Sequence, residues 1–445
     1  MDLVIKKCRI PMKNKIFEAE IAIDEGKIHT IAKAANIPKA SEKINVKGNL
    51  IFPGLIDVHV HLRDLELAYK EDFYSGTCAA IAGGFTTILD MPNTKPPTNS
   101  ANRIKEKMVK AGAKIVSNVG FFAGYPSTLE ELESLKNAGA CGLKIYPYSN
   151  MGRSSLADED LLRLTLQATK ESKLILVVHA EDPAIIERGQ KRLKKDQISS
   201  LRALTNTHPP EAEIKAIEKI CRIATEIHSP IHICHTSLSD SVTLINEAKK
   251  NGAEISCEVT LHHLLLTEKI LDEQKGFALM NPPLRDYETI QKLWNMLTKG
   301  NIDIIASDHA PHTIEEKKGI MSEGVLPGIP GLETTLPLLL TQVNNDRLSL
   351  FQLVMLLAEN PARIFNLKNK GCIKPGYDAD LTIVDLKQKF TIDSSKFHSK
   401  ARYTPFEGFK VVGKPVKVML NGETVMEDGE IWLKPGGAQV ILPER

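Results

Sequence analysis

Two histidines separated by one residue, His59 and His61, are the clearest chemical signal in the sequence. They follow an apolar run at residues 50–56 that is typical of a buried strand, along which side chains alternate between faces. Both imidazoles are therefore expected on one side, and Arg63, two residues further on, is expected to share it. Two neutral imidazoles on one face form half of a metal site. Taken alone, the motif is better explained as two structural histidines at the end of a strand.

The other candidate residues each stand at the end of a later apolar run: Lys144, His179, His235 and Asp308. Histidine and aspartate are ordinary metal ligands, whereas lysine is not. Each residue alone is more simply explained as a hydrogen-bonded or ion-paired group at a strand end. Their recurrence after successive strands instead predicts one metal site, provided that these strands end at a common rim.

The elements that would position these residues are strands alternating with helices. Eight strands are predicted at residues 55–62, 86–91, 114–122, 142–146, 174–179, 231–235, 254–259 and 302–307. Helices are predicted between them at residues 99–111, 128–138, 158–171, 211–227 and 287–297. This alternation predicts an α/β fold, specifically a (β/α)8 TIM barrel, in which active sites lie at the carboxyl ends of the strands.

The two ends of the chain have a different pattern. Short strand-like segments separated by turns occupy residues 3–5, 20–23, 27–31, 380–385, 416–420 and 430–432. We therefore predict a smaller composite β-domain that is formed from both termini. The predicted boundaries are 1–52 and 370–445 for its two parts, and 53–369 for the barrel.

Period-two alternation separates other histidines from the predicted site. His232 and His309 point away from the candidate ligands beside them, so both are interpreted as structural. A structural role is also assigned to three more histidines: His29, His228 and His398. His262 and His263 stay undecided, because they stand at the expected rim but are not needed to complete the ligand set.

The composition excludes several classes of protein. The chain has 445 residues, a formal net charge of +2, 42% hydrophobic residues and 25% charged residues, as expected of a globular protein. A charge so near zero gives no reason to expect nucleic acid or an anionic membrane as a partner. Seven scattered cysteines without a CxxC pair favour a reducing compartment over a disulfide scaffold or a zinc–cysteine site. With neither a signal peptide nor a membrane-length apolar run, the sequence predicts a cytoplasmic protein.

The ordered set of candidate residues resembles the amidohydrolase superfamily and, within it, the dihydroorotase family of class I type. The motifs that carry the resemblance are residues 57–63, 91–94, 281–285, 307–312, 327–333, 360–362 and 374–381. The chain departs from the family pattern at two places, and both affect the shape of a loop. Relatives commonly continue with Pro-Gly where this chain has Leu65 and Glu66, and they have proline where this chain has Leu261.

The resemblance implies two zinc ions at the barrel mouth. His59, His61 and Asp308 would hold one ion, and His179 and His235 would hold the other. Lys144 stands where many relatives have a lysine that CO₂ converts into a bridging carbamate. Some bacterial relatives use an aspartate bridge and hold fewer metals, but a lysine at this position favours the two-metal form.

The implied reaction is the reversible, zinc-dependent cyclisation of N-carbamoyl-L-aspartate to L-dihydroorotate and water in pyrimidine (UMP) biosynthesis. Asp308 would be the catalytic residue that moves a proton between water and the ring nitrogen. Arg63 would bind the substrate carboxylate bidentately. The other implied substrate-binding residues are Asn93, Asn281, His312, Pro327 and Gly328. The alternative for Arg63 is a salt bridge at the rim to Asp64 or Glu66.

Two other functions are compatible with the same residues. A cyclic amidase for allantoin or a dihydropyrimidine would use the same metals, although Arg63, Asn93 and His312 argue against it. A non-catalytic barrel would usually have lost ligands, and this chain keeps the whole set. The resemblance leaves open a homo-oligomer and association with aspartate carbamoyltransferase. Residues 151–155, which contain glycine and serine, are a candidate loop over the site.

Overall fold

The computed structural model of the chain describes residues 1–12, 15–147, 156–192, 201–320 and 324–444, so the candidate loop at 151–155 lies outside the described residues. In the described part, parallel strands pair in sequence order to form an eight-stranded sheet. These strands are β6 (Leu55–Val60), β7 (Phe85–Asp90), β8 (Asn118–Gly124), β9 (Ala140–Ile145), β10 (Leu176–Val178), β11 (Ile231–Ile233), β12 (Ile255–Thr260) and β13 (Ile304–Ala306).

The sheet closes into the predicted barrel. A parallel bridge pairs Val60, the last residue of β6, with His309 beyond β13. The backbone N–H of His61 donates to the carbonyl of His309 at 2.8 Å. Every residue of these strands is buried, as expected when helices cover the outside and side chains fill the inside. The predicted (β/α)8 fold is therefore confirmed.

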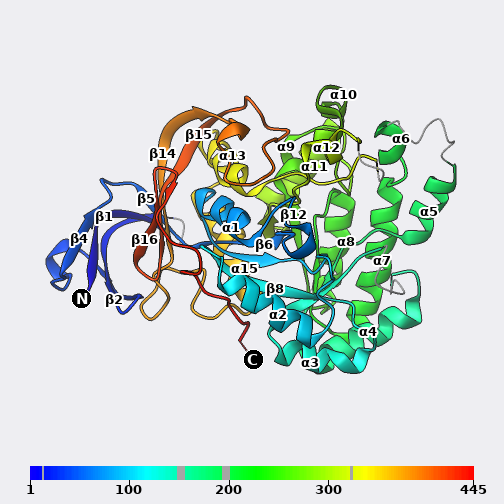
Figure 1. The fold of residues 1–445 in the computed structure, drawn as a ribbon, viewed down its shortest axis with the longest axis horizontal. Coiled ribbons are helices and arrows are strands. Elements are labelled where there is room, and N and C mark those ends of the chain that lie inside the picture. Colours follow the sequence, from blue (N-terminus) through cyan, green and yellow to red (C-terminus); the bar gives the residue numbers. More distant parts are fainter. Residues whose placement is uncertain (13–14, 148–155, 193–200, 321–323, 445) are drawn as a thin grey trace.

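The helices pack around the outside of the barrel. Most of them lie on the side away from the strands of the two termini (Figure 1). They are α1 (Phe73–Ala82), α2 (Ala101–Gly112), α3 (Leu132–Asn137), α4 (Glu159–Ser172), α5 (Pro183–Arg192), α6 (Leu201–Thr205), α7 (Pro210–Ile227), α8 (Ser239–Lys250), α9 (Leu261–Leu265), α10 (Ile270–Gln274), α11 (Tyr287–Thr298), α12 (Ile314–Lys317), α13 (Leu332–Asn344), α14 (Leu350–Val354) and α15 (Asn360–Ile364). Shorter turns are η1 (Ala34–Asn36), η2 (Leu65–Leu67), η3 (Leu129–Glu131), η4 (Lys275–Ala278), η5 (Met355–Glu359) and η6 (Ser394–Lys396).

Polar side chains cap the start of several helices, although the longest, α7, begins at Pro210 without a side-chain cap. Asp158 accepts from the N–H of Leu161 at the start of α4, and Asp286 does the same for Thr289 at the start of α11. The largest difference at the start of a predicted barrel strand is in β8, which begins at Asn118 because the N–H groups of Lys114 and Ile115 donate to the carbonyl of Ala111 and complete the end of α2.

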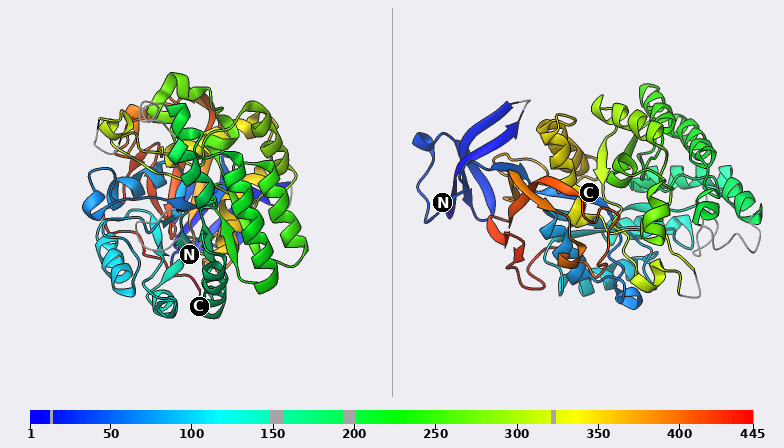
Figure 2. Two further views of the ribbon diagram at one scale, coloured as in Figure 1. Left: turned by 90° about the vertical axis from the view of Figure 1, so that its right-hand side faces the viewer. Right: turned by 90° about the horizontal axis from the view of Figure 1, so that it is seen from above.

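The remaining strands of the described chain form one separate nine-stranded sheet from both termini, as predicted. Figure 2 shows the N-terminal strands projecting from one end of the molecule. The strands are β1 (Leu3–Met12), β2 (Lys15–Asp24), β3 (Lys27–Ala32), β4 (Glu42–Asn45), β5 (Leu50–Pro53), β14 (Leu381–Thr391), β15 (Lys410–Leu420), β16 (Glu423–Glu427) and β17 (Glu430–Ile431). The antiparallel pairing of β5 with β14 joins the two halves of the sheet. The boundaries predicted for the domains stay a prediction.

Two contacts tie the termini to the barrel. The buried carboxylate of Asp380 accepts from Lys370 Nζ at 2.6 Å and from the amide of Asn118 on β8 at 3.1 Å. The C-terminal tail runs beside the start of β8, where the N–H of Val119 donates to Gln439 and the N–H of Ile441 donates to Val119. The last residues of the chain therefore cover the amino-terminal end of a barrel strand.

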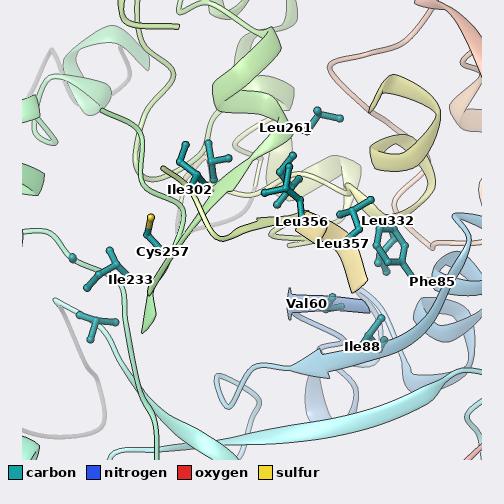
Figure 3. Close-up of a cluster of buried hydrophobic side chains, with 14 of the residues drawn as sticks. Val60, Phe85, Ile88, Ile233, Cys257, Leu261, Ile302, Leu332, Leu356 and Leu357 are labelled. Carbon is teal, nitrogen blue, oxygen red and sulfur yellow. The ribbon is translucent and has the colours of Figure 1, made fainter. Parts of the chain in front are cut away.

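Apolar side chains from strands and outer helices form the largest core cluster. Figure 3 shows part of it, with Val60 and Ile88 from β6 and β7 near Phe85 and Leu332. Leu332 begins α13, so this core joins the first barrel strands to a late helix. Such continuous packing fixes the strand ends, and with them the side chains that follow the strands.

We predict that Asp380→Asn destabilises the protein. It removes one carboxylate partner of the buried Lys370 ammonium, which costs about 3 kcal/mol when a buried pair is broken. Chemical denaturation should show this loss, which Glu423→Gln on the exposed part of β16 should not reproduce. An unchanged unfolding midpoint for Asp380→Asn would show that the junction contributes little to stability.

Candidate active site

The six predicted metal ligands converge at the carboxyl ends of the barrel strands. His59 lies in β6 and Lys144 in β9, while four follow strands directly or within a few residues: His61, His179, His235 and Asp308. The ring centroid of His59 lies 5.3 Å from those of His61 and His235, and the centroids of His179 and His235 are 4.3 Å apart. Side chains separated by up to 249 positions in the sequence thus lie close together.

His59, His61 and Asp308 offer three ligand atoms to one cation. Asp308 Oδ1 lies 3.3 Å from His59 Nε2 and 3.2 Å from His61 Nε2, and the three atoms lie within 4.8 Å of one another. Burial opposes charge on Asp308, yet the two imidazoles hold its pKa well below the usual range. The group is therefore an anionic carboxylate, as a metal ligand requires.

Hydrogen bonds on the opposite side of each ring turn these Nε2 atoms inward. His59 Nδ1 lies 2.5 Å from Oε1 of Glu258, and His61 Nδ1 lies 2.6 Å from Oδ1 of Asn93. Burial opposes the charged form of His59, but the carboxylates of Asp308 and Glu258 outweigh it and raise the pKa of His59 to about 10. Such outer partners commonly fix the orientation of metal-binding histidines.

The second pair of histidines is arranged differently. His179 Nε2 lies 2.6 Å from Glu181, whose carboxylate also accepts from His208 Nδ1 at 3.0 Å. This contact leaves His179 Nδ1 as the atom able to bind a metal. His235 Nδ1 is buried and has no hydrogen-bond partner among the residues that the structure describes. A buried orphan nitrogen is costly in a folded protein, and a bound cation would satisfy it.

Lys144 extends into the same pocket. Its side chain is buried, and its Nζ lies 2.7 Å from Sγ of Cys234. Cys234 also forms a second possible ligand group with His59 and Glu258. We favour the group that contains Asp308, because Glu258 is already engaged by His59 Nδ1 and His232.

Arg63 reaches the pocket by a different route from the one predicted. Strand β6 ends at Val60, and Arg63, Asp64 and Leu65 all have positive φ, so a left-handed turn places the side chain instead of strand alternation. Arg63 Nε donates to the carbonyl of Pro311 at 3.2 Å. Asp64 pairs with Lys114 at 3.0 Å, and the described residues provide no ion-pair partner for Arg63, so the rim salt bridge is not formed.

Among the remaining predicted substrate-binding residues, His312 lies beside Arg63 and Asn93 lies beside a predicted metal ligand. His312 Nε2 lies 3.3 Å from Arg63 Nη2 and 3.0 Å from the carbonyl of Pro327. Burial, Arg63 and nearby lysines hold the pKa of His312 far below its usual range, so its ring is neutral. Asn93 contacts His61, and the partly buried Asn281 follows Met280 in the loop before α11.

The histidines interpreted as structural or left undecided have protein partners. His232 Nε2 lies 3.0 Å from Glu258, and its ring packs against Phe365 in the helix layer. His263 lies between Thr260 Oγ1 and the carbonyl of Pro282. Burial and His263 hold the pKa of His262 well below its usual range, so it is a neutral ring near the pocket.

Known proteins share both the fold and the length of this chain. A profile described as the amidohydrolase family matches residues 50–425. The chain belongs to the amidohydrolase family. Among curated relatives, the dihydroorotase of Methanothermobacter thermautotrophicus is 39% identical, covering 97% of this chain and 95% of that protein. The dihydroorotase of Pyrococcus horikoshii is 40% identical, with coverages of 99% and 96%. The solved L-hydantoinase (dihydropyrimidinase) from Arthrobacter aurescens superposes with a TM-score of 0.94 at 33% identity, covering 99% of each chain.

Membership of the amidohydrolase family makes the chain a hydrolase of a type that generally depends on metal, and the convergent ligand atoms agree with this. The described residues contain no helix long and apolar enough to cross a membrane. Sequence reasoning missed Glu258 and Glu181, which hold His59 and His179. The signal for Glu181 was its position two residues after His179, whereas Glu258 gives no local signal.

We predict that Glu258→Gln lowers the affinity of the metal-free protein for zinc by about 10- to 100-fold. The reason is that the neutral amide no longer fixes His59 as the carboxylate does. Competition with a chromogenic chelator measures this affinity, and circular dichroism reports on folding. Glu254→Gln, at an exposed position just before β12, is the matched control. Equal affinities for the two variants would contradict a role for Glu258 in the site.

Proposed function

We propose that the chain is a dihydroorotase that interconverts N-carbamoyl-L-aspartate and L-dihydroorotate with release of water, as a step of pyrimidine (UMP) biosynthesis. Relatives with this activity in their names match nearly the whole chain. The single observation that carries the proposal is Arg63, a buried guanidinium beside the metal-ligand cluster, 8% exposed.

A buried guanidinium without an anion is energetically unfavourable, because the charge loses its hydration and gains no opposite charge. In the described part of the chain, the direct contacts of Arg63 are a carbonyl oxygen and the neutral ring of His312, while the carboxylates of Asp308 and Asp90 act on it from beyond ion-pair distance. A carboxylate on the substrate would complete the pair, and guanidinium groups bind carboxylates in bidentate geometry. Dihydroorotate carries such a carboxylate on its ring. This complementarity supports a carboxylated cyclic amide over an uncharged one.

The ligand set fits a two-zinc centre. His59, His61 and Asp308 would hold one ion, His179 and His235 the other, and Lys144 would bridge them as a carbamate. When bound, zinc polarises a carbonyl group and lowers the pKa of water to about 7, which supplies a nucleophile at neutral pH.

The protein side chains would have two kinds of role in this reaction, binding of the ring and proton transfer. Arg63 and His312 would orient the ring through its carboxylate, with Asn93, Asn281 and the Pro327–Gly328 backbone lining the pocket. Asp308 would accept a proton from the attacking water and return it to the ring nitrogen when the amide C–N bond breaks. In the cyclising direction the same carboxylate would act in reverse order.

A second candidate function is hydrolysis of an uncharged ring such as hydantoin or a dihydropyrimidine. The high TM-score with L-hydantoinase favours this candidate, since the two chains share one fold over nearly their whole length. Arg63 argues against it, because an uncharged ring would leave this guanidinium without an ion-pair partner among the described residues.

We predict that Arg63→Ala retains its zinc but hydrolyses dihydroorotate at least about 100-fold more slowly, since charge-assisted bidentate bonds to the substrate are lost. Turnover of dihydroorotate, hydantoin and dihydrouracil should be compared for the wild type and this variant. Arg103→Ala, at an exposed position of α2, is the control. Wild-type preference for the uncharged rings would refute the proposed function, and near wild-type turnover by Arg63→Ala would refute the role of Arg63.

We predict about two zinc ions per chain in freshly purified protein, falling to about one in Lys144→Met, which cannot form a bridging carbamate. Elemental analysis gives the stoichiometry, and Lys105→Met on exposed α2 should leave it unchanged. Full wild-type activity with clearly one zinc ion per chain would contradict the two-metal centre.

Three further expectations accompany the proposed function. Seven free cysteines fit a reducing cytoplasm. Aspartate carbamoyltransferase makes carbamoyl-aspartate, so association with that enzyme would deliver the substrate directly. A homo-oligomer is proposed on the resemblance alone. Size-exclusion chromatography of the protein, with and without the transcarbamoylase, tests both partners.

A further inference from the structure

A second buried cation lies behind the predicted carboxylate site. Lys317, the last residue of α12, is 1% exposed, and the described residues offer it no ion-pair partner. Its Nζ instead donates to three carbonyl oxygens, those of Leu279 at 3.1 Å, Leu326 at 2.9 Å and Gly328 at 2.7 Å. An ammonium group has three N–H donors, so all of them are used.

These carbonyl groups belong to two different loops. Leu279 precedes Asn281, and Leu326 and Gly328 flank Pro327, so each loop carries predicted substrate-binding residues. The N–H of Gly328 also donates to the carbonyl of Leu279 at 2.9 Å. Lys317 therefore holds the two loops together at the point where they line the pocket.

Tyr403, from the segment that follows β14, contacts the loop that contains Gly328 from outside the barrel. Its hydroxyl accepts from the N–H of His312 at 3.3 Å and donates to the carbonyl of Gly328 at 3.5 Å. Lys317 Nζ lies 5.9 Å from the centre of the Tyr403 ring, within the range of a cation–π contact. The C-terminal segment thus touches two of the residues expected to face the substrate.

Burial and the nearby Arg63 lower the pKa of Lys317 to about 7, and in its protonated form Lys317 adds to a cationic surrounding. Arg63, Lys70 and Lys317 all act on His312. Carboxylates oppose this charge in part: Glu316 pairs with Lys70 at 2.8 Å, and Asp308 and Asp90 act on Arg63. An apolar side chain could fill the space of Lys317 without the cost of burying an ammonium group. A positive charge here instead favours an anionic ligand in the pocket.

We propose that Lys317 and Tyr403 are positioning residues of the carboxylate subsite formed by Arg63, His312 and the Pro327–Gly328 loop. They fix the carbonyl of Pro327 against which His312 is held, and so set where Arg63 and His312 meet the carboxylate. This inference rests on the proposed function and extends it to two residues that are not expected to touch the ring.

The test measures ligand binding apart from turnover. In the zinc-loaded protein, Lys317→Met should weaken binding of orotate, an oxidised ring with the same carboxylate, by about tenfold. It should raise KM for dihydroorotate by a similar factor while kcat changes less than about threefold, since the reacting atoms are untouched. Tyr403→Phe should weaken orotate binding by about threefold. Calorimetry gives Kd, and elemental analysis should show unchanged zinc.

The control is Lys318→Met, which removes an exposed ammonium from the next residue and should change nothing. Unchanged Kd and KM in the folded variants would overturn the proposal. If Lys317→Met does not fold, an unchanged Kd in Tyr403→Phe overturns it. A wild-type protein that neither binds orotate nor hydrolyses dihydroorotate would refute the proposed function instead, so the two failures are distinguishable.

Discussion

The buried carboxylate of Glu258 is the interaction on which the barrel mouth depends. It meets His59 Nδ1, His232 Nε2 and the backbone N–H of His235 at once, and so joins three strands. Burial opposes its charge, but these imidazoles hold the pKa of Glu258 well below its usual range. A fixed anion at this point keeps Nε2 of His59 directed at the centre, and the remaining ligands are arranged around that direction.

The contacts around Glu258 explain why some of the site could be predicted from sequence and some could not. His59 and His61 were paired correctly because strand alternation is a local rule, and the same rule placed His232 toward the helices. Glu258 itself looks like any polar residue of a strand, and its partner His59 lies 199 positions away. Contacts of this kind depend on how the barrel closes, which no local pattern specifies.

The residues on the substrate-binding side likewise include some that could be predicted from the sequence and some that could not. Arg63 was found from its place after His61, although the left-handed turn that delivers it was not foreseen. Lys317 and Tyr403 carry no signal in the sequence, since an isolated lysine or tyrosine is usually exposed or structural. The fold class was predictable throughout, because eight repeats of strand and helix leave few alternatives.

The tail that pairs with β8 has a consequence for synthesis of the protein. Residues 439–441 supply part of the cover at the amino-terminal end of the barrel, and β5 finds its partner β14 more than 320 positions later. The barrel strands can pair once His309 has been synthesised, whereas the nine-stranded sheet is complete only after β14–β17 have been made. Until then β5 exposes an unpaired edge, the kind of edge that can pair with another chain.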